Sequence, residues 1–378
     1  MKQHSFKRIL IIATRQIGDT LITTPLIQRA KEIWPEAQID FLGFEHAKDI
    51  LHGNPYLHQI IGTSQKPKLQ EYLKILQKIF FQYDLAIITQ PSDRSYIYGL
   101  FAAPKRVGVA HPGKEDHGWK KWITQYQVPI DYFQQHVITE KLRLLTPFQK
   151  NTNKPTDFLK NNPPEVFVTP PISVHLPIEI ADISKDAIVV HPTPLNAYKR
   201  WPTANWTGLI EHLSRLEIPV IISGAHTLSD QTLNTEIITS LSESAAQTVT
   251  NMTGKLTLSE LGTLLKHAKA YIGVDTAITH LAAACNTPTI ALFGPTPPSN
   301  FGPWPNGFRG EQPYLIRASS QTQQHITILQ GTQDCVPCRK AGCEDHANSP
   351  SACLNELSLE RVLTALDTTL QNLPKRDI

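Results

Sequence analysis

Short apolar runs alternate along the first part of this chain with longer stretches that show helical spacing of apolar residues. A strand buried on both faces reads as a continuous apolar run, whereas an amphipathic helix repeats its apolar positions every three or four residues. Strands that alternate with helices favour a parallel α/β sheet. We predict strands at residues 8–13, 39–42, 85–88 and 107–109, and helices at residues 19–33 and 69–81.

The alternation stops in a proline-rich segment and then starts again. Residues 151–186 lose the periodicity and are crowded with prolines, which is typical of a linker between domains. We therefore predict a Rossmann-like domain at 1–150, a linker at 151–186, a second Rossmann-like domain at 187–355 and a C-terminal helix within 356–378. The second domain has predicted strands at 187–191, 219–223, 270–274 and 287–293, and predicted helices at 203–216, 259–269 and 276–284.

Composition narrows the class of protein. The chain has 378 residues, of which 40% are hydrophobic and 18% charged, so it holds enough apolar material for globular cores. The apolar run at residues 9–14 is far shorter than the ~18 residues that a membrane span needs. We expect a soluble, cytoplasmic protein.

The net charge of +3 is unevenly spread along the chain. Residues 1–160 carry 22 Lys and Arg against 14 Asp and Glu, whereas residues 161–378 carry 14 against 19. A basic half indicates an acidic partner, such as phosphate groups or an anionic membrane surface, unless these lysines are simply solvated helix faces. No block of like charge is long enough for a nucleic-acid arm, so no nucleic-acid partner is expected.

Four of the five cysteines lie close together near the C-terminus. The first two have the C-x-x-C spacing that suits a metal site or a redox pair, and the other two follow at uneven spacing. A structural metal, a facultative disulfide and a reduced cluster that orders the loop all remain open. These residues are Cys335, Cys338, Cys343 and Cys353.

Ligands of doubly wound sheets bind beyond the carboxyl ends of the strands, so the turns that follow strands are the places to search. The first such turn, residues 15–20, lacks both G-x-G-x-x-G and the P-loop pattern. It offers a carboxylate, Asp19, at a helix start. This carboxylate could accept a proton from a substrate hydroxyl, or Asp19 could merely cap the helix.

Two turns in the second half carry polar and cationic residues. Lys199 and Arg200 precede a predicted helix, where they could neutralise a diphosphate or form a solvated basic loop. The turn after residue 274 opens a helix whose free N–H groups suit phosphate, and Thr276 adds a hydroxyl. Asp275 is better placed to bind sugar hydroxyls, and His280 is either a ligand contact or a core histidine.

These turns together resemble a known family. The elements are Arg15-x-x-Gly18-Asp19, then His191-Pro192 with Lys199-Arg200-Trp201-Pro202, then Asp275-Thr276 to His280 followed by Phe293-Gly294-Pro295. In this order the chain resembles the bacterial lipopolysaccharide heptosyltransferases of glycosyltransferase family 9. The segments at residues 93–94, 105–108 and 119–122 are most like the heptosyltransferase III type.

The resemblance implies a GT-B architecture, in which two doubly wound Rossmann-like domains face a central cleft. It implies an inverting transfer of heptose from ADP-L-glycero-D-manno-heptose to the inner core of lipopolysaccharide, with no cofactor and no catalytic metal. Asp19 would be the general base and Lys199 would stabilise the leaving diphosphate. Donor-binding positions would be Thr193, Lys199, Asp275, Thr276, Ala277, His280 and Gly294.

The acceptor in this family, a lipid A-core oligosaccharide, is phosphorylated and membrane-anchored, which agrees with the basic first half. Acceptor-binding candidates are Arg15, Lys120 and Lys121, and residues 117–122 are a candidate acceptor or membrane-contact loop, or a packed surface loop. The expected location is cytoplasmic, peripheral on the inner membrane.

Two departures from the family pattern bear on the donor. Ala277 stands where many relatives have glycine, and Thr193 begins a segment that is often glycine-rich. A family 9 enzyme that uses another nucleotide sugar therefore stays as an alternative. A non-catalytic nucleotide-sugar-binding protein is a separate alternative, and the presence of Asp19 and Lys199 counts against it. A nicotinamide-dependent oxidoreductase is disfavoured because the dinucleotide motif is missing.

Overall fold

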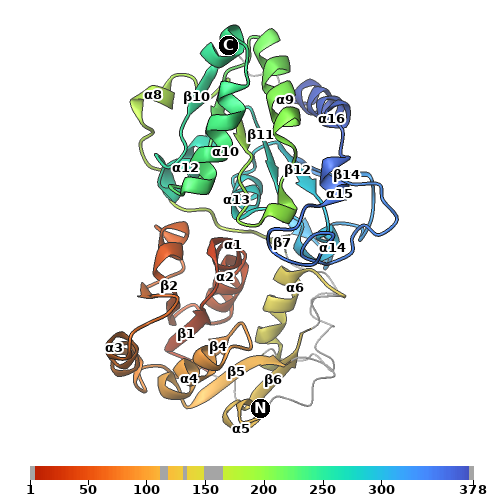
Figure 1. Ribbon diagram of the computed structural model, residues 1–378. Coiled ribbons are helices and arrows are strands. Elements are labelled where there is room, and N and C mark those ends of the chain that lie inside the picture. The colour runs from red at the N-terminus through yellow and green to blue at the C-terminus, as the bar shows by residue number, and fades with distance from the viewer. Residues whose placement is uncertain (1–4, 111–117, 131–133, 149–164, 374–378) are drawn as a thin grey trace. The chain divides into compact units, whose positions relative to one another are not determined.

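A computed structural model describes residues 5–110, 118–130, 134–148 and 165–373 (Figure 1). The chain divides into two compact units. Unit 1 comprises Met1–Pro171 and Gly307–Gln312, and unit 2 comprises Ile172–Asn306 and Pro313–Ile378. Residues 151–164 of the predicted linker lie outside the described residues.

Unit 1 is built on a six-stranded parallel sheet with the order β3-β2-β1-β4-β5-β6. The central strand β1 (Arg8–Ala13) is apolar along its length, and Ile9 to Ile12 are fully buried, because helices cover both faces of such a sheet. The other strands are β2 (Gln38–Phe44), β3 (Gln59–Thr63), β4 (Leu85–Ile88), β5 (Lys105–Ala110) and β6 (Tyr126–Pro129). The helices are α1 (Ile17–Leu21), α2 (Thr24–Ile33), α3 (Leu69–Ile79), α4 (Asp93–Ala102), α5 (Lys120–Ile123) and α6 (Val137–Leu142), with 3₁₀ helices at Glu45–Leu51 and Arg143–Phe148.

Unit 2 repeats this design in a seven-stranded sheet with the order β10-β9-β8-β11-β12-β15-β14, in which only β14 is antiparallel. In its core, the apolar side chains of the strands pack against Trp201 and Trp206, whose indole rings are perpendicular. Val362 and Leu366 of the C-terminal helix belong to the same core. The strands are β8 (Ile188–His191), β9 (Val220–Ile222), β10 (Val249–Asn251), β11 (Ala270–Val274), β12 (Thr289–Phe293), β14 (Ser320–Gln323) and β15 (Ile326–Gln330). The helices are α8 (Ile178–Ala181), α9 (Thr203–Arg215), α10 (Leu228–Thr239), α11 (Glu243–Gln247), α12 (Leu258–His267), α13 (Ala277–Ala284), α14 (Pro298–Phe301), α15 (Ala352–Asn355) and α16 (Leu359–Gln371), with a 3₁₀ helix at Ala197–Lys199.

A small ribbon returns the chain from unit 2 to unit 1. Strand β13 (Phe308–Arg309) pairs antiparallel with β7 (Glu165–Val166), and Arg309 forms an ion pair with Glu165 at 2.8 Å. Thr139 of α6 also donates to the backbone carbonyl of Glu311 at 2.7 Å. Residues 307–312 therefore complete unit 1, although they follow most of unit 2 in the sequence.

The predicted helix at residues 19–33 is wrong as a single element, because it breaks between Leu21 and Thr24. Pro25 lacks an N–H and its ring would clash with the carbonyl four residues earlier, which belongs to Leu21. That carbonyl instead accepts a hydrogen bond from the Thr24 hydroxyl at 2.8 Å. The five-residue helix α1 is thereby separated from α2.

Several strands were not predicted from the sequence: β3, β6, β10, β14 and β15. Most of them lie at the ends of the sheets, where alternating exposure weakens the apolar signal; β14, for example, reads Ser-Gln-Thr-Gln.

Along the part of the chain that the structure describes, no helix is both long enough and apolar enough to span a bilayer.

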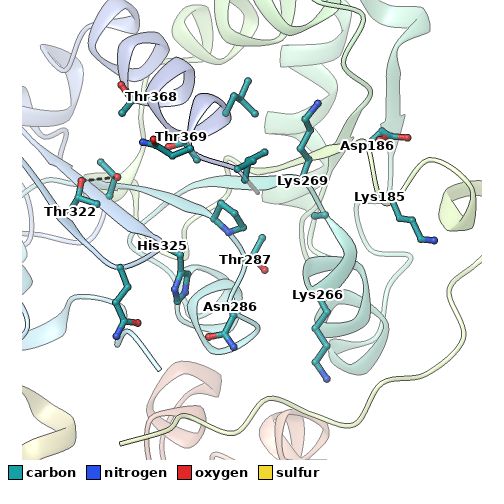
Figure 2. Close-up of a pocket in the computed structure, with 17 residues that line it drawn as sticks. Lys185, Asp186, Lys266, Lys269, Asn286, Thr287, Thr322, His325, Thr368 and Thr369 are labelled. Atoms are coloured by element: carbon teal, nitrogen blue, oxygen red, sulfur yellow. Dashed lines mark hydrogen bonds between the residues drawn. The ribbon is translucent and has the colours of Figure 1, made fainter. Parts of the chain in front are cut away.

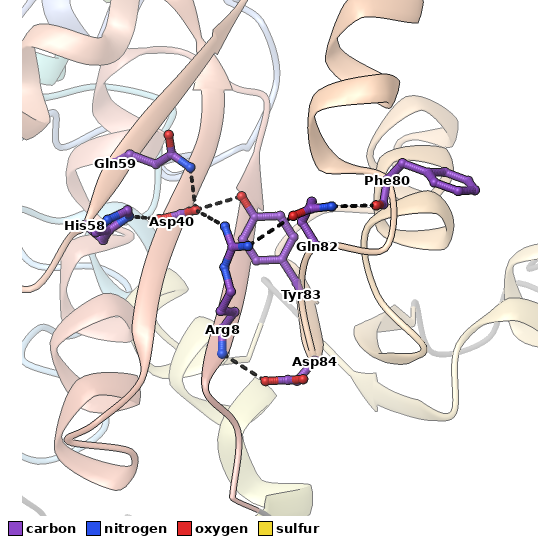
Figure 3. Close-up of polar contacts among 8 residues, drawn as sticks. All are labelled: Arg8, Asp40, His58, Gln59, Phe80, Gln82, Tyr83 and Asp84. Carbon is purple, nitrogen blue, oxygen red and sulfur yellow. Dashed lines mark hydrogen bonds and ion pairs between the residues drawn. The ribbon is translucent and has the colours of Figure 1, made fainter.

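A buried carboxylate joins strands β1, β2 and β3 to the segment before β4, at the amino-terminal edge of the unit 1 sheet (Figure 3). Asp40 of β2 is 1% exposed and accepts hydrogen bonds from the Tyr83 hydroxyl and the Gln59 amide, both at 2.7 Å. The His58 ring lies 3.0 Å from its other oxygen, and Arg8 lies 3.8 Å away. A buried charge needs such partners because it has lost its water. Burial and the bond to Asp40 raise the pKa of Tyr83 well above its ordinary value, so its hydroxyl remains a donor.

We predict that Tyr83→Phe lowers the free energy of unfolding by about 1–3 kcal/mol, since it removes a donor from a buried carboxylate. Urea unfolding measures the change. Tyr126→Phe is the matched control, because no hydrogen bond of the Tyr126 hydroxyl is found among the described residues. Equal losses in the two variants would contradict the assigned role of the network.

Candidate functional site

Each sheet reverses its strand order beside its first strand. In unit 1 the reversal lies between β1 and β4, and in unit 2 it lies between β8 and β11. The connections that leave two such strands run to opposite faces of the sheet, so a crevice opens at their carboxyl ends and ligands bind there. Most of the predicted site residues follow one of the two strands that flank each reversal.

Asp19 lies in the first turn of α1, which follows β1 directly. The N-cap position of this helix is Gln16, so the alternative that Asp19 only caps the helix is wrong. The amide oxygen of Gln16 lies 2.9 Å from the His46 ring. Among the described residues, no hydrogen bond or ion pair to the Asp19 carboxylate is found. A half-buried carboxylate in this state is free to accept a proton from a bound hydroxyl.

A cavity of about 590 Å³ adjoins this turn at the carboxyl ends of β1, β2 and β4. Two arginines line it. The Arg15 Nε donates to the Gln90 amide oxygen at 2.9 Å, and Arg94 donates to the Gln65 carbonyl at 2.8 Å while its guanidinium stacks 5.1 Å from the Phe44 ring. Guanidinium groups held in this way present their remaining N–H donors to an anionic ligand.

The other two predicted acceptor residues lie on α5, and they differ from each other. The Lys120 Nζ contacts the Pro91 carbonyl and the Asp93 carboxylate, both at 2.7 Å, so it fixes the loop between β4 and α4. Lys121 lies 5.4 Å from the ring of Trp122, which is 81% exposed. Residue 117 of the predicted contact loop lies outside the described residues.

In unit 2 the structure brings together two residues that are 76 positions apart in the sequence. The Lys199 Nζ lies 2.6 Å from a carboxylate oxygen of Asp275, which follows β11 and is 6% exposed. Burial acts to raise the pKa of Asp275, but the Lys199 ammonium and, more weakly, His280 and Thr296 outweigh it, so the pKa lies below its ordinary value. Asp275 is therefore ionised, and it holds the Lys199 ammonium at the carboxyl edge of the sheet.

The helix that follows Asp275 is α13, and Thr276 is its N-cap. The Thr276 hydroxyl accepts from the Ile278 N–H at 3.2 Å, so the earlier N–H of Ala277 points out of the helix start without an intrahelical partner. His280 lies one turn further along, where it acts electrostatically on Asp275. The N–H groups at this helix start, together with the Lys199 ammonium held by the preceding Asp275, suit a phosphate group.

Thr193 and Gly294 complete the predicted donor set. The Thr193 hydroxyl lies two residues after β8, is buried, and has no hydrogen-bond partner among the residues described here, which favours a ligand partner. Gly294 follows β12, and a Cβ at this position would come within 2.9 Å of Leu354 and 3.2 Å of the Cys353 sulfur. Close packing is thus sufficient reason for a glycine there.

Sequence reasoning missed Arg94 as a site residue, and it missed Lys141 altogether. Arg94 was noted only as part of a subtype cue, although it follows the strand beside β1 and so belongs at the same edge. Lys141 is 4% exposed, and its ammonium contacts the turn that carries Asp19. Nothing in the local sequence distinguishes it from a surface lysine.

The C-terminal cysteines are free thiols. Burial, together with the neighbouring Cys338 and Cys343, raises the pKa of the Cys353 thiol to about 11, whereas Cys335 and Cys343 are exposed. Across the described ranges, no group of three or more His, Cys, Asp or Glu residues is arranged to hold a metal ion. The geometry thus gives no support to the metal alternative.

A second cavity, of about 800 Å³, lies at the opposite edge of the unit 2 sheet, where β8, β11, β12 and β15 begin (Figure 2). None of the predicted site residues lines it. Its three lysines, Lys185, Lys266 and Lys269, extend in different directions (Figure 2). They do not converge on one ligand position, and no activity is assigned to this cavity.

Similarity to known proteins assigns the chain to a family. The sequence profile of glycosyltransferase family 9 (heptosyltransferase) matches residues 72–339, well over half of the chain. The chain belongs to glycosyltransferase family 9. This glycosyltransferase is 29% identical over 301 residues to lipopolysaccharide heptosyltransferase 3 of Escherichia coli, covering 76% of this chain and 84% of that protein. The predicted resemblance to the heptosyltransferase III type is confirmed.

Solved structures confirm the predicted fold class, GT-B with two Rossmann-like units, for this family 9 enzyme. A glycosyl transferase family 9 structure from Veillonella parvula superposes with a TM-score of 0.75 at 16% identity, covering 98% of this chain and 99% of that one. The E. coli ADP-heptose lps heptosyltransferase II superposes with a TM-score of 0.72 at 18% identity, covering 96% and 98%.

The buried His191 at the end of β8 gives a prediction on pH. Burial lowers its pKa to about 4 from 6.5, and its ring lies 3.0 Å from the Ser223 hydroxyl. Between pH 6.5 and 4 the unfolded chain therefore binds a proton that the folded chain does not, so stability falls on acidification, by about 1–3 kcal/mol for this group.

We expect His191→Asn, whose amide can still reach Ser223, to lose less stability than the wild type across this window. Urea unfolding at pH 6.5 and at pH 4.5 provides the comparison. Parallel losses in the two proteins would show that His191 is already charged in the folded state.

Proposed function

We propose that this enzyme transfers heptose from ADP-L-glycero-D-manno-heptose to the inner core of lipopolysaccharide, with inversion at the anomeric carbon. Family membership and the relatives named for lipopolysaccharide and ADP-heptose support the substrate class. The observation that carries the proposal is that each unit has a reactive group at its strand reversal: the Asp19 carboxylate in unit 1 and the Lys199–Asp275 pair in unit 2.

Asp19 is the general base in this proposal. Its carboxylate takes the proton of the acceptor hydroxyl as that oxygen forms a bond to the anomeric carbon, and the bond from this carbon to the diphosphate breaks. The role is supported because no hydrogen-bond donor occupies the oxygens of this carboxylate among the described residues, so they are open to an acceptor hydroxyl.

Unit 2 binds the donor and stabilises the leaving ADP. Lys199 places its ammonium against the diphosphate, and the start of α13 at Thr276 and Ala277 adds N–H and hydroxyl donors. Together they supply the positive potential that a metal ion supplies in other enzymes, so we propose a metal-independent reaction. Thr193, Asp275 and His280 hold the nucleoside and sugar hydroxyls, and Gly294, which follows the neighbouring strand β12, completes the donor site.

The acceptor is a lipid A-core oligosaccharide, and Arg15, Lys120 and Lys121 bind it in unit 1. Arg15 lines a cavity beside Asp19, and Lys121 lies next to the exposed indole of Trp122, a pair suited to an anionic lipid surface. We therefore propose a cytoplasmic enzyme that associates peripherally with the inner membrane.

Asp19→Asn should abolish the base while it keeps the shape of the side chain. We expect turnover to fall by about 10²–10⁴-fold with no change in ADP affinity, because the donor site is in unit 2. Acceptor-dependent ADP release measures turnover, and isothermal titration calorimetry measures ADP binding. Asp49→Asn, an exposed aspartate of the same unit, should behave as wild type. Turnover that survives in Asp19→Asn would rule out this base.

Lys199→Ala should weaken ADP binding and slow transfer together, since it removes the cation next to the diphosphate and leaves Asp275 buried without its partner. We expect at least a tenfold loss of ADP affinity, or about 1.4 kcal/mol. Lys269→Ala, at the opposite edge of the same sheet, is the control. Wild-type affinity in Lys199→Ala would remove Lys199 from the donor site.

The transfer assay should also be run with nucleotide sugars other than ADP-heptose, because Ala277 and Thr193 depart from the family pattern.

A further inference from the structure

A buried lysine holds the short helix that carries Asp19. Lys141 belongs to α6 and is 4% exposed. Its Nζ donates to the Asp19 backbone carbonyl at 2.8 Å and to the Thr23 hydroxyl at 2.6 Å. Lysine is almost never buried to this extent unless its charge is partnered, because removing an ammonium group from water is costly.

The break before Pro25 explains why the Asp19 carbonyl needs these donors. In a continuous helix this carbonyl would accept the Thr23 N–H, but that N–H donates to Thr20 at 3.1 Å. The Thr23 hydroxyl, at 2.7 Å, and Lys141 bond to the Asp19 carbonyl instead. A helix of five residues has too few internal hydrogen bonds to be stable alone, so contacts from outside it decide its position.

The charge of Lys141 suits this role. A cation near the C-terminal end of a helix interacts favourably with the last carbonyls. Burial lowers the pKa of Lys141 to about 8; the Asp19 carboxylate opposes this effect and Arg15 adds to it. The amine therefore stays mostly protonated at neutral pH and keeps all three of its N–H donors.

We propose that Lys141 is a positioning residue for Asp19: it binds the backbone of α1 from α6 and so fixes where the catalytic carboxylate lies. This inference rests on the proposed role of Asp19 as base.

Lys141→Met tests the proposal, since methionine keeps the volume and removes the donors. Hydrogen exchange of the Thr20, Ile22 and Thr23 amides is the first measurement, because it needs no substrate. We expect these amides to exchange at least tenfold faster than in the wild type, while the amides of β1 are unchanged. Lys74→Met, an exposed lysine of α3, is the control and should alter neither set. Unchanged exchange in the turn would overturn the proposal.

Kinetics then separate positioning from a purely structural role. We expect kcat to fall by about 10–100-fold in Lys141→Met with ADP affinity unchanged, because a misplaced base slows the chemical step only. In an Asp19→Asn background the same substitution should have little further effect, whereas multiplied effects would show that Lys141 acts independently of Asp19. If Lys141→Met does not fold, Lys141→Gln, which removes the charge and shortens the donor but leaves the bond from the Thr23 hydroxyl to the Asp19 carbonyl in place, should show the same pattern to a smaller degree.

The outcomes for the two proposals are distinguishable. Wild-type protein that transfers no heptose would overturn the proposed function, and the exchange experiment would still decide whether Lys141 holds the turn. Loss of activity in Asp19→Asn with normal kcat in Lys141→Met would keep the base and reject the positioning role.

Discussion

The reversal of strand order beside β1 and β8 determines where this enzyme can carry out chemistry. Because the connections from neighbouring strands leave toward opposite faces, the carboxyl edge of each sheet is open at that one point. The apolar strands supply the rigidity, and in the proposed function the residues that follow them supply the chemistry. Asp19, Arg15 and Arg94 lie at the reversal in unit 1, and Thr193, Lys199 and Asp275 lie at the reversal in unit 2.

Buried charges serve two different purposes at the two edges of these sheets. At the amino-terminal edge of unit 1, Asp40 is surrounded by donors from several elements, which leaves it no capacity for a ligand. At the carboxyl edge of unit 2, Asp275 has a single strong partner in Lys199, whose ammonium still has donors for another group. The first arrangement stabilises the fold, and the second leaves Lys199 with donors for the diphosphate that we propose it binds.

The sequence was sufficient to predict the two-unit α/β design and the strands at the centre of each sheet, because fully buried strands such as β1 and β11 read as unbroken apolar runs. It was insufficient where the decisive contact is long-range. The ion pair between Lys199 and Asp275, the arginine pair at residues 15 and 94, and the burial of Lys141 all depend on packing between distant segments. The break before Pro25 is a different kind of miss. It could have been predicted from the sequence, because the effect of a proline on the preceding turn of a helix follows from local geometry.

The ribbon of β7 and β13 has a consequence for how the protein is made. Residues 307–312 belong to unit 1 but leave the ribosome after most of unit 2, so β7 and Thr139 of α6 lack these partners until late in synthesis. The amino-terminal half is therefore not a finished folding unit when its own sheet is complete. A chain truncated near residue 171 would expose an unpaired strand edge and lose the hydrogen bond from Thr139, and co-translational chaperones would be expected to meet the protein in that state.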